Sequence, residues 1–244
     1  MVAMAEAAEA AKPLYLRMKE DLLRRVQSGE WRPGELVPSE NALAAEYGVS
    51  VGTARKAIEE LADQRLLVRQ RGRGTTVAMH THRQEVQRYY RLVTADGERL
   101  NQETAYIDVT PARASAQEAR ALGISRGAHV ARVRRLRLFR KRPLVSEILA
   151  LREDVMPGIG VLIDATRPDV LYQLLERQYH IIIAKVREKV TAVKAEAGDV
   201  ELLGVALGDP MLQIERIGFD LKGTAVERRL MRACNDAHYV SESD

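Results

Sequence analysis

A short basic segment, residues 65–78, has the side chains needed to bind a polyanion. It reads RLLVRQRGRGTTVA and contains four arginines, two glycines and no acidic residue. The pattern predicts two short strands, 66–70 and 75–79, joined by a turn whose glycines allow positive φ or close approach to another surface. Phosphate groups facing Arg69, Arg71 and Arg73 are one explanation of this charge. A solvated basic loop is the other.

Three predicted helices precede this hairpin, at about 13–28, 39–47 and 50–64, because apolar residues recur there at helical spacing. Gly29 and Gly48 are placed to end the first two helices. Ser39 and Ser50 are placed to cap the second and third. The order of elements is therefore helix, helix, short turn, helix and hairpin, within residues 12–79.

This succession of elements has a known physical use, which is reading double-stranded DNA. A helix fits the major groove, and the second helix of a helix–turn–helix enters it with its N-terminal residues leading. Ser50 and Thr53 can bond phosphates or base edges, and Arg55 can reach a phosphate or a guanine. A basic hairpin beside such a helix lies against the DNA backbone or the minor groove.

Residues 34–78, GELVPSENALAAEYGVSVGTARKAIEELADQRLLVRQRGRGTTVA, resemble the N-terminal winged-helix domain of the GntR family of bacterial repressors. The matching motifs are PSE, LA..YGVS, T.RKAI..L and RGRGT.V. The resemblance implies a DNA-binding transcriptional regulator. Asn41 and Val51 stand where the family usually has arginine, so we expect a different operator sequence. The predicted DNA-contacting residues are Ser39, Asn41, Ser50, Val51, Gly52, Thr53, Arg55, Arg69, Arg71, Gly72 and Arg73.

Residues 80–89 are predicted to be a linker, and residues 90–244 a second domain. Strand patterns occur at 102–110, 128–139, 143–151, 184–196, 210–221 and 224–234, and helical patterns at 115–121, 168–178 and 198–204. Strands that follow one another directly predict hairpins, so the fold class is α+β with a mainly antiparallel sheet. Segments 122–130 and 203–211 resemble each other, which indicates two related halves.

Charged residues on these strands suit a small-molecule site. Arg135 and Arg137 are two residues apart on one strand, so they point to one face, and Glu147 lies on the next strand. Glu227 lies on a late strand. Arginine binds carboxylate or phosphate in a bidentate manner, so the set suits an anionic or zwitterionic metabolite. The alternative is a solvated sheet face with cross-strand ion pairs.

The second domain resembles the effector-binding UTRA domain of the HutC subfamily, which has a chorismate-lyase-like fold. The matches are VARVRRLRLFRKRPLVSE, LYQLL, LGVALGDPMLQIERIGFD and AVERRLMR. The resemblance implies a homodimeric repressor, released from a palindromic operator by a small effector, and it adds Tyr172 to the predicted effector site. Val170 and Ala233 replace a serine and an aromatic residue of the family's phosphosugar binders, which argues against a phosphosugar.

Composition narrows the function further. A net charge of +4 and a pI near 9.2 permit a polyanionic partner. A single cysteine and five histidines without ligand spacing predict no disulfide, no metal site and no cofactor. Without a signal peptide or a membrane-spanning run, we expect a cytoplasmic protein and no membrane partner. Two alternatives remain open: an enzyme related to chorismate lyase, and a ligand-independent DNA-binding protein. A non-enzymatic regulator is the favoured interpretation.

Overall fold

The computed structural model describes residues 12–64, 66–78, 91–98, 103–234 and 236–241. The chain divides into two compact units. The predicted linker at 80–89 lies outside the described residues. The predicted domain limits therefore stay predictions.

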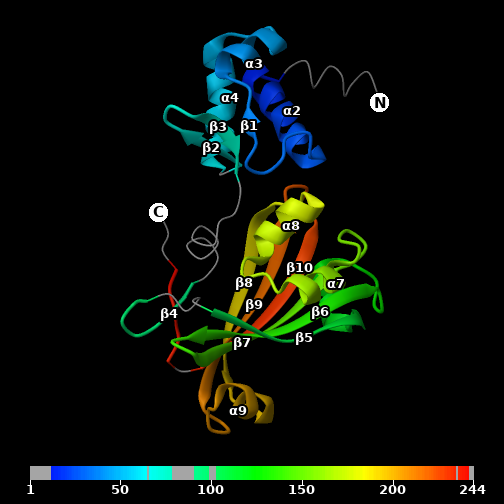
Figure 1. Cartoon of the computed structure of the whole chain (residues 1–244), viewed down its shortest axis with the longest axis vertical. Helices are drawn as coiled ribbons and strands as arrows, with labels where there is room; N and C mark the ends of the chain where they lie inside the picture. The colour runs from blue at the N-terminus through cyan, green and yellow to red at the C-terminus, as the bar shows by residue number, and fades with distance from the viewer. Residues whose placement is uncertain (1–11, 65, 79–90, 99–102, 235, 242–244) are drawn as a thin grey trace. The chain divides into compact units, whose positions relative to one another are not determined.

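The N-terminal unit contains the three predicted helices and the predicted hairpin (Figure 1). Their bounds are α2 (Leu14–Ser28), α3 (Glu40–Tyr47), α4 (Val51–Asp63), β2 (Leu67–Gln70) and β3 (Gly74–Val77). A two-residue strand, β1 (Leu36–Val37), was not predicted because it is too short to show an alternating pattern. It pairs with β3 and completes an antiparallel sheet in the order β1-β3-β2.

The predicted helix ends of this unit are confirmed. The Ser39 side chain accepts a hydrogen bond from the Ala42 amide, and the Ser50 side chain accepts one from the Thr53 amide. Gly29 and Gly48 end α2 and α3 in the left-handed conformation. The helices pack through buried apolar side chains, which are Met18, Leu22, Val26, Leu43, Ala54, Ala57, Ile58 and Leu61.

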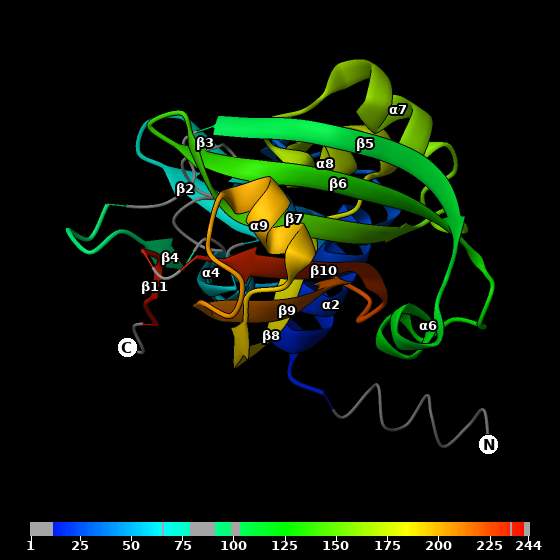
Figure 2. The same cartoon turned by 90° about the horizontal axis from the view of Figure 1, so that it is seen from below.

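The C-terminal unit is built on a six-stranded antiparallel sheet, in the order β5-β6-β7-β10-β9-β8 (Figure 2). Its strands are β5 (Glu103–Arg113), β6 (His129–Phe139), β7 (Arg142–Arg152), β8 (Ile183–Lys194), β9 (Pro210–Asp220) and β10 (Ala225–Ala233). All six were predicted, with bounds that differ by only a few residues. A small separate pair, β4 (Leu92–Val93) with β11 (His238–Tyr239), was not predicted.

The sheet consists of two halves with the same order of elements, β5-α6-β6-β7 and β8-α9-β9-β10. The helices α6 (Ala116–Leu122) and α9 (Ala197–Leu203) each begin with a capping box and end at a left-handed glycine. The boxes are formed by Ser115 with Glu118 and by Glu196 with Asp199. The predicted relation between the two halves is therefore confirmed, and the sheet has an approximate internal two-fold symmetry.

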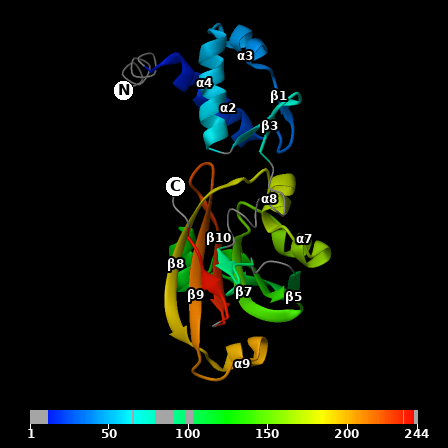
Figure 3. The ribbon, with the colours of Figure 1, turned by 90° about the vertical axis from the view of Figure 1, so that its left-hand side faces the viewer.

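The two faces of the sheet are covered by different helices. On the face that we call the outer face, Arg132 pairs with Glu118 of α6 at 2.8 Å, and Arg232 pairs with Asp199 of α9 at 2.6 Å. The opposite, inner face carries α7 (Ile159–Thr166) and the start of α8 (Leu171–Tyr179), which Figure 3 shows on one side of the strands.

Helix α7 was missed because its sequence contains turn-forming glycines. Gly158 precedes the helix in the left-handed conformation, and Gly160 lies within it. A Cβ on Gly160 would come within 3.1 Å of the Ala131 Cβ on the inner face. The glycine therefore allows the helix to lie close to the sheet, which is a tertiary reason that the local pattern does not reveal.

Candidate functional site

The N-terminal end of α4 is exposed and carries several of the predicted DNA-contacting residues. Ser50 caps the helix, and its Oγ lies 2.8 Å from the Thr53 hydroxyl. Val51, Gly52 and Arg55 are exposed beside it. The positive end of the helix dipole is thus open to an anion, next to side chains that can donate hydrogen bonds.

The predicted hairpin, β2 and β3, is the wing of the predicted winged-helix domain. Its tip is the turn between these two strands. Gly72 and Gly74 have φ values of 78° and 96°, a region that favours glycine, as predicted. Arg71 and Arg73 are exposed, and no ion pair holds either of them within the part of the chain that the structure describes. Their charges are therefore available to an external partner.

Glu40 links this wing to α4, and sequence analysis did not single it out. It accepts a hydrogen bond from Arg55 Nε at 2.9 Å and also pairs with Arg69. The hydrogen bond from Arg55 to Glu40 raises the pKa of this guanidinium above its ordinary value. Glu40 lies between Ser39 and Asn41, both exposed, so the predicted DNA-contacting residues of α3, α4 and β2 share one surface. The signal in the sequence was the acidic residue of the PSE motif.

The inner face of the C-terminal sheet brings together the predicted Arg135, Arg137 and Glu147. Glu147 accepts hydrogen bonds from Arg135 Nε at 2.6 Å and from Arg137 Nε at 3.2 Å. All three side chains are at most 2% exposed. The alternative interpretation is therefore wrong about solvation, because these side chains are buried, but the cross-strand ion pairs that it expected are present.

Arg229 joins the remaining predicted residues to this cluster. It donates a hydrogen bond to Glu227 at 2.5 Å and lies 3.6 Å from the Glu147 carboxylate. Its guanidinium is 5.7 Å from the centre of the Tyr172 ring. Sequence analysis missed Arg229, although its spacing of two residues from Glu227 places both on one face by the same rule that paired Arg135 with Arg137.

The electrostatics of Glu147 are set by two opposing effects. Burial alone would raise the pKa of its carboxyl group, because the charged form loses its hydration. Arg135, Arg137 and Arg229 outweigh this effect and hold the pKa below the ordinary range of a glutamate. The carboxylate is therefore ionised at neutral pH and is surrounded by three positive charges.

The cluster continues along the inner face toward the far edge of the sheet. Arg216 on β9 pairs with Glu188 on β8 at 2.7 Å, and Tyr239 donates a hydrogen bond to Glu188 at 2.6 Å. Neither residue of this pair was predicted. Among the described residues, no donor reaches Glu147 Oε1 or Glu227 Oε2 within hydrogen-bonding distance. These two buried carboxylate oxygens retain acceptor capacity.

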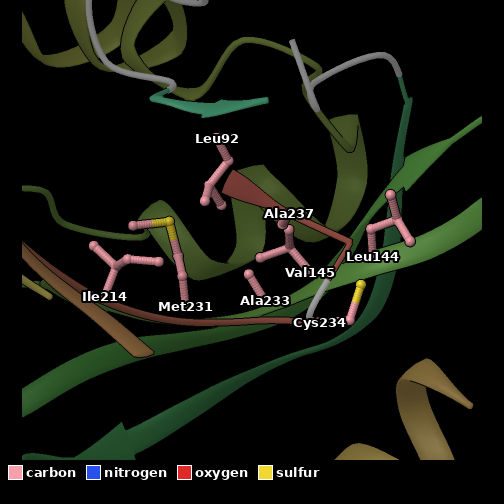
Figure 4. Close-up of a cluster of buried hydrophobic side chains, with 8 residues drawn as sticks. All are labelled: Leu92, Leu144, Val145, Ile214, Met231, Ala233, Cys234 and Ala237. Atoms are coloured by element: carbon pink, nitrogen blue, oxygen red, sulfur yellow. The ribbon is translucent and has the colours of Figure 1, made fainter. Parts of the chain in front are cut away.

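Ala233, which stands where the family's phosphosugar binders carry an aromatic residue, lies in an apolar core. Ala233 is fully buried with Val145, Met231 and Leu92, as Figure 4 shows. The same cluster holds Cys234, the only cysteine of the chain, and burial raises the pKa of its thiol. A buried, protonated thiol is a packing residue rather than a nucleophile.

Two family models match the chain in the order of its two units. The model for bacterial regulatory proteins of the gntR family matches residues 14–77, and the model for the UTRA domain matches residues 97–238. The chain therefore belongs to the GntR-type transcriptional regulators that carry a UTRA domain.

Relatives of this kind extend over most of the chain. The histidine utilization repressor of Pseudomonas aeruginosa is 31% identical over 85% of this chain and 82% of its own length. The repressor NagR of Bacillus subtilis is 26% identical over 88% of both chains. A solved ligand-binding domain assigned to the GntR family, from Bordetella bronchiseptica, matches 64% of this chain and 98% of its own with a TM-score of 0.58 and 29% identity.

Among the described residues, no helix has both the length and the apolar character needed to cross a bilayer. The same residues contain no group of three or more histidine, cysteine, aspartate or glutamate side chains arranged to hold a metal ion.

Proposed function

We propose that this protein is a cytoplasmic repressor that binds a palindromic operator as a homodimer and is released by a small anionic or zwitterionic metabolite. The observation that supports DNA reading best is the surface joined by Glu40, where α4 and the wing present exposed arginines together. Phosphates would compete with Glu40 for Arg55 and Arg69, while Arg71 and Arg73 would bind phosphates without losing an ion pair to any residue that the structure describes.

The buried cluster of Arg135, Arg137, Glu147, Glu227 and Arg229 supports the proposed effector site. Buried ion pairs are weak contributors to stability, because their desolvation costs as much as their attraction returns. An effector with a carboxylate or phosphate would compete with Glu147 for the arginines. An effector with an ammonium or hydroxyl group would use the acceptor capacity of Glu227.

Operator binding is tested by a gel-shift and footprint titration on the DNA upstream of the protein's own gene, against a scrambled duplex at physiological salt. We expect a protected palindrome that is bound about 10³-fold more tightly than the scrambled duplex. Weak, salt-sensitive binding that ignores sequence would contradict the proposal.

Effector binding is tested by thermal unfolding against a panel of organic acids and amino-acid derivatives. A specific ligand stabilises by RT ln(1 + [L]/Kd), so a saturating effector raises Tm. Arg135→Ala is expected to abolish this rise and the release of DNA, while operator binding stays intact. Normal release in this variant would place the effector elsewhere, and turnover of chorismate by the purified protein would favour the enzyme alternative.

A further inference from the structure

The four residues at the start of α4, 50–53, differ in what they can offer to a base pair. Ser50 and Thr53 are bound to each other, because the Ser50 side chain caps the Thr53 amide and the two hydroxyls lie 2.8 Å apart. Gly52 has no side chain. Val51 remains, a branched apolar residue that is 38% exposed. The first turn of α4 therefore presents an apolar side chain to its surroundings.

Helix formation and core packing do not account for a valine at position 51. A branched side chain loses rotational freedom in a helix, so valine is a weaker helix former than alanine. Ala54 and Ile58 of the same helix offset such costs by burial, since they are at most 1% exposed. Val51 gains this stabilisation only when another molecule covers its methyl groups.

Gly52 indicates that such a molecule approaches the helix end closely. Glycine is less favourable than alanine inside a helix, and Gly52 is not among the glycines with positive φ. Among the described residues, a Cβ at this position would meet only the Ser50 Oγ, at an ordinary contact distance of 3.7 Å. Backbone conformation and packing within the described chain thus do not require this glycine. A missing side chain does allow close contact with an outside surface.

Val51 and Arg55 present two different chemistries on one face of α4. They are four residues apart and both exposed, so they are neighbours on the helix surface, about 6 Å apart along the axis. This distance is less than two base-pair steps of about 3.4 Å. In the major groove, guanine displays the acceptors N7 and O6, and thymine displays an apolar C5-methyl group. The partner that suits an exposed valine beside an arginine is therefore a thymine.

We infer that Val51 reads thymine, by packing its methyl groups against the C5-methyl of one thymine in each operator half-site. The inference rests on the proposed operator binding and names the chemical feature of the operator that this position selects. Guanine at the same place is disfavoured, because valine has no donor for its N7 and O6, which would lose water without gaining a partner.

Removal of a single methyl group from the DNA tests this contact without altering base pairing. Duplexes bound by the full-length protein are first selected from a random pool. Each thymine of the selected half-site is then replaced by deoxyuridine, which lacks only the C5-methyl. We expect one position per half-site at which this replacement lowers affinity about fourfold, the size of one buried methyl group. In the Val51→Ala variant, the same replacement should leave affinity nearly unchanged.

Cytosine and 5-methylcytosine provide the same comparison on a second base. At the position that depends on Val51, methylation of a cytosine should raise affinity by a similar factor in the wild type and not in Val51→Ala. The matched control is Val161→Ala, because Val161 is a valine near the start of α7 that is 78% exposed. This variant should retain the full loss on replacement of thymine by deoxyuridine.

Thermal unfolding checks that the variants are folded, and Val51→Ser replaces Val51→Ala if the alanine variant is not. The inference is overturned if no thymine shows the methyl effect, or if the Val51 variant shows it as strongly as the wild type. A selected palindrome without any methyl effect rejects the thymine contact alone and leaves the regulator in place. A pool that yields no preferred sequence rejects the operator-binding regulator, and the thymine contact with it.

Discussion

Arginine is used in opposite ways in the two units of this protein. On the N-terminal unit, Arg55, Arg69, Arg71 and Arg73 are exposed, and among the described residues only the first two of them have acidic partners. On the inner face of the C-terminal sheet, Arg135 is fully buried against Glu147. The difference lies in the dielectric surroundings, because an exposed pair is screened by water and exchanges partners readily, whereas a buried pair does not.

This contrast separates binding from stability. Exposed arginines contribute little to folding and remain available for phosphates, so their replacement should alter DNA affinity and leave stability intact. Buried arginines depend on the carboxylates that neutralise them, so a change there should affect stability first. Variants of the exposed and of the buried charged residues therefore test this separation.

Replacement of Glu147 by glutamine should destabilise the C-terminal unit by about 3–5 kcal/mol, because it leaves three buried arginines without their shared carboxylate. Urea unfolding followed by far-UV circular dichroism measures this loss. Glu98→Gln, which disturbs an exposed pair with Arg140 in the same unit, is the matched control and should cost under about 1 kcal/mol. Equal losses of stability in the two variants would contradict the proposed difference between buried and exposed ion pairs.

Low pH should destabilise the C-terminal unit through the same carboxylate. The pKa of Glu147 is lowered in the folded state, so the stability that it contributes is present above the pKa of an unfolded glutamate and is lost as the pH falls below it. The lowered pKa values of Glu118, Glu188 and Asp199 act in the same direction. We expect the free energy of unfolding to decrease as the pH is lowered past about 4.

This pH dependence is measured by urea unfolding at a series of pH values. The Glu147→Gln variant should show a shallower dependence than the wild type, since one of the titrating groups has been removed. An identical dependence in both proteins would mean that Glu147 is not the ionised group at the centre of the cluster.

Replacement of Arg71 by alanine should weaken binding to all DNA sequences and lower the salt slope of binding by about 1, because one phosphate contact is removed. Thermal unfolding should be unchanged, since Arg71 has no ion pair among the described residues. Titrations of operator and scrambled duplexes at several salt concentrations measure the slope. An unchanged slope would mean that Arg71 of the wing does not contact a phosphate.

The smallest expected effect concerns Glu40. Glu40→Gln frees Arg55 and leaves Arg69 with Glu59 alone, so affinity for scrambled DNA should rise about two- to fivefold, the size of an exposed ion pair. The ratio of operator to scrambled affinity should fall, because Arg55 is no longer held in one orientation. Glu46→Gln is the control, since Glu46 lies on the same helix and pairs with Arg25 instead. Equal shifts in both variants would reject a specific role for Glu40.

The N-terminal unit was largely predictable because its signals are local. Ser39 and Ser50 cap helices in the structure as their spacing predicted, and Gly72 adopts the positive φ that its turn requires. A cap or a turn depends on residues that are close in sequence, so a short pattern contains the relevant physics. Glu40 was missed because its partners Arg55 and Arg69 are 15 and 29 residues away.

The sequence by itself determined the order of elements, the class of each domain, the relation between the two halves of the sheet and the face shared by Arg135 and Arg137. Only the tertiary structure decided that β7 lies beside β10, which brings Arg229 to Glu147 and joins the two halves into one sheet. It also decided that this cluster is buried and that α7 covers the inner face. The physical reason is that strand order and register are set by contacts between residues distant in the chain, and burial depends on everything packed around a side chain.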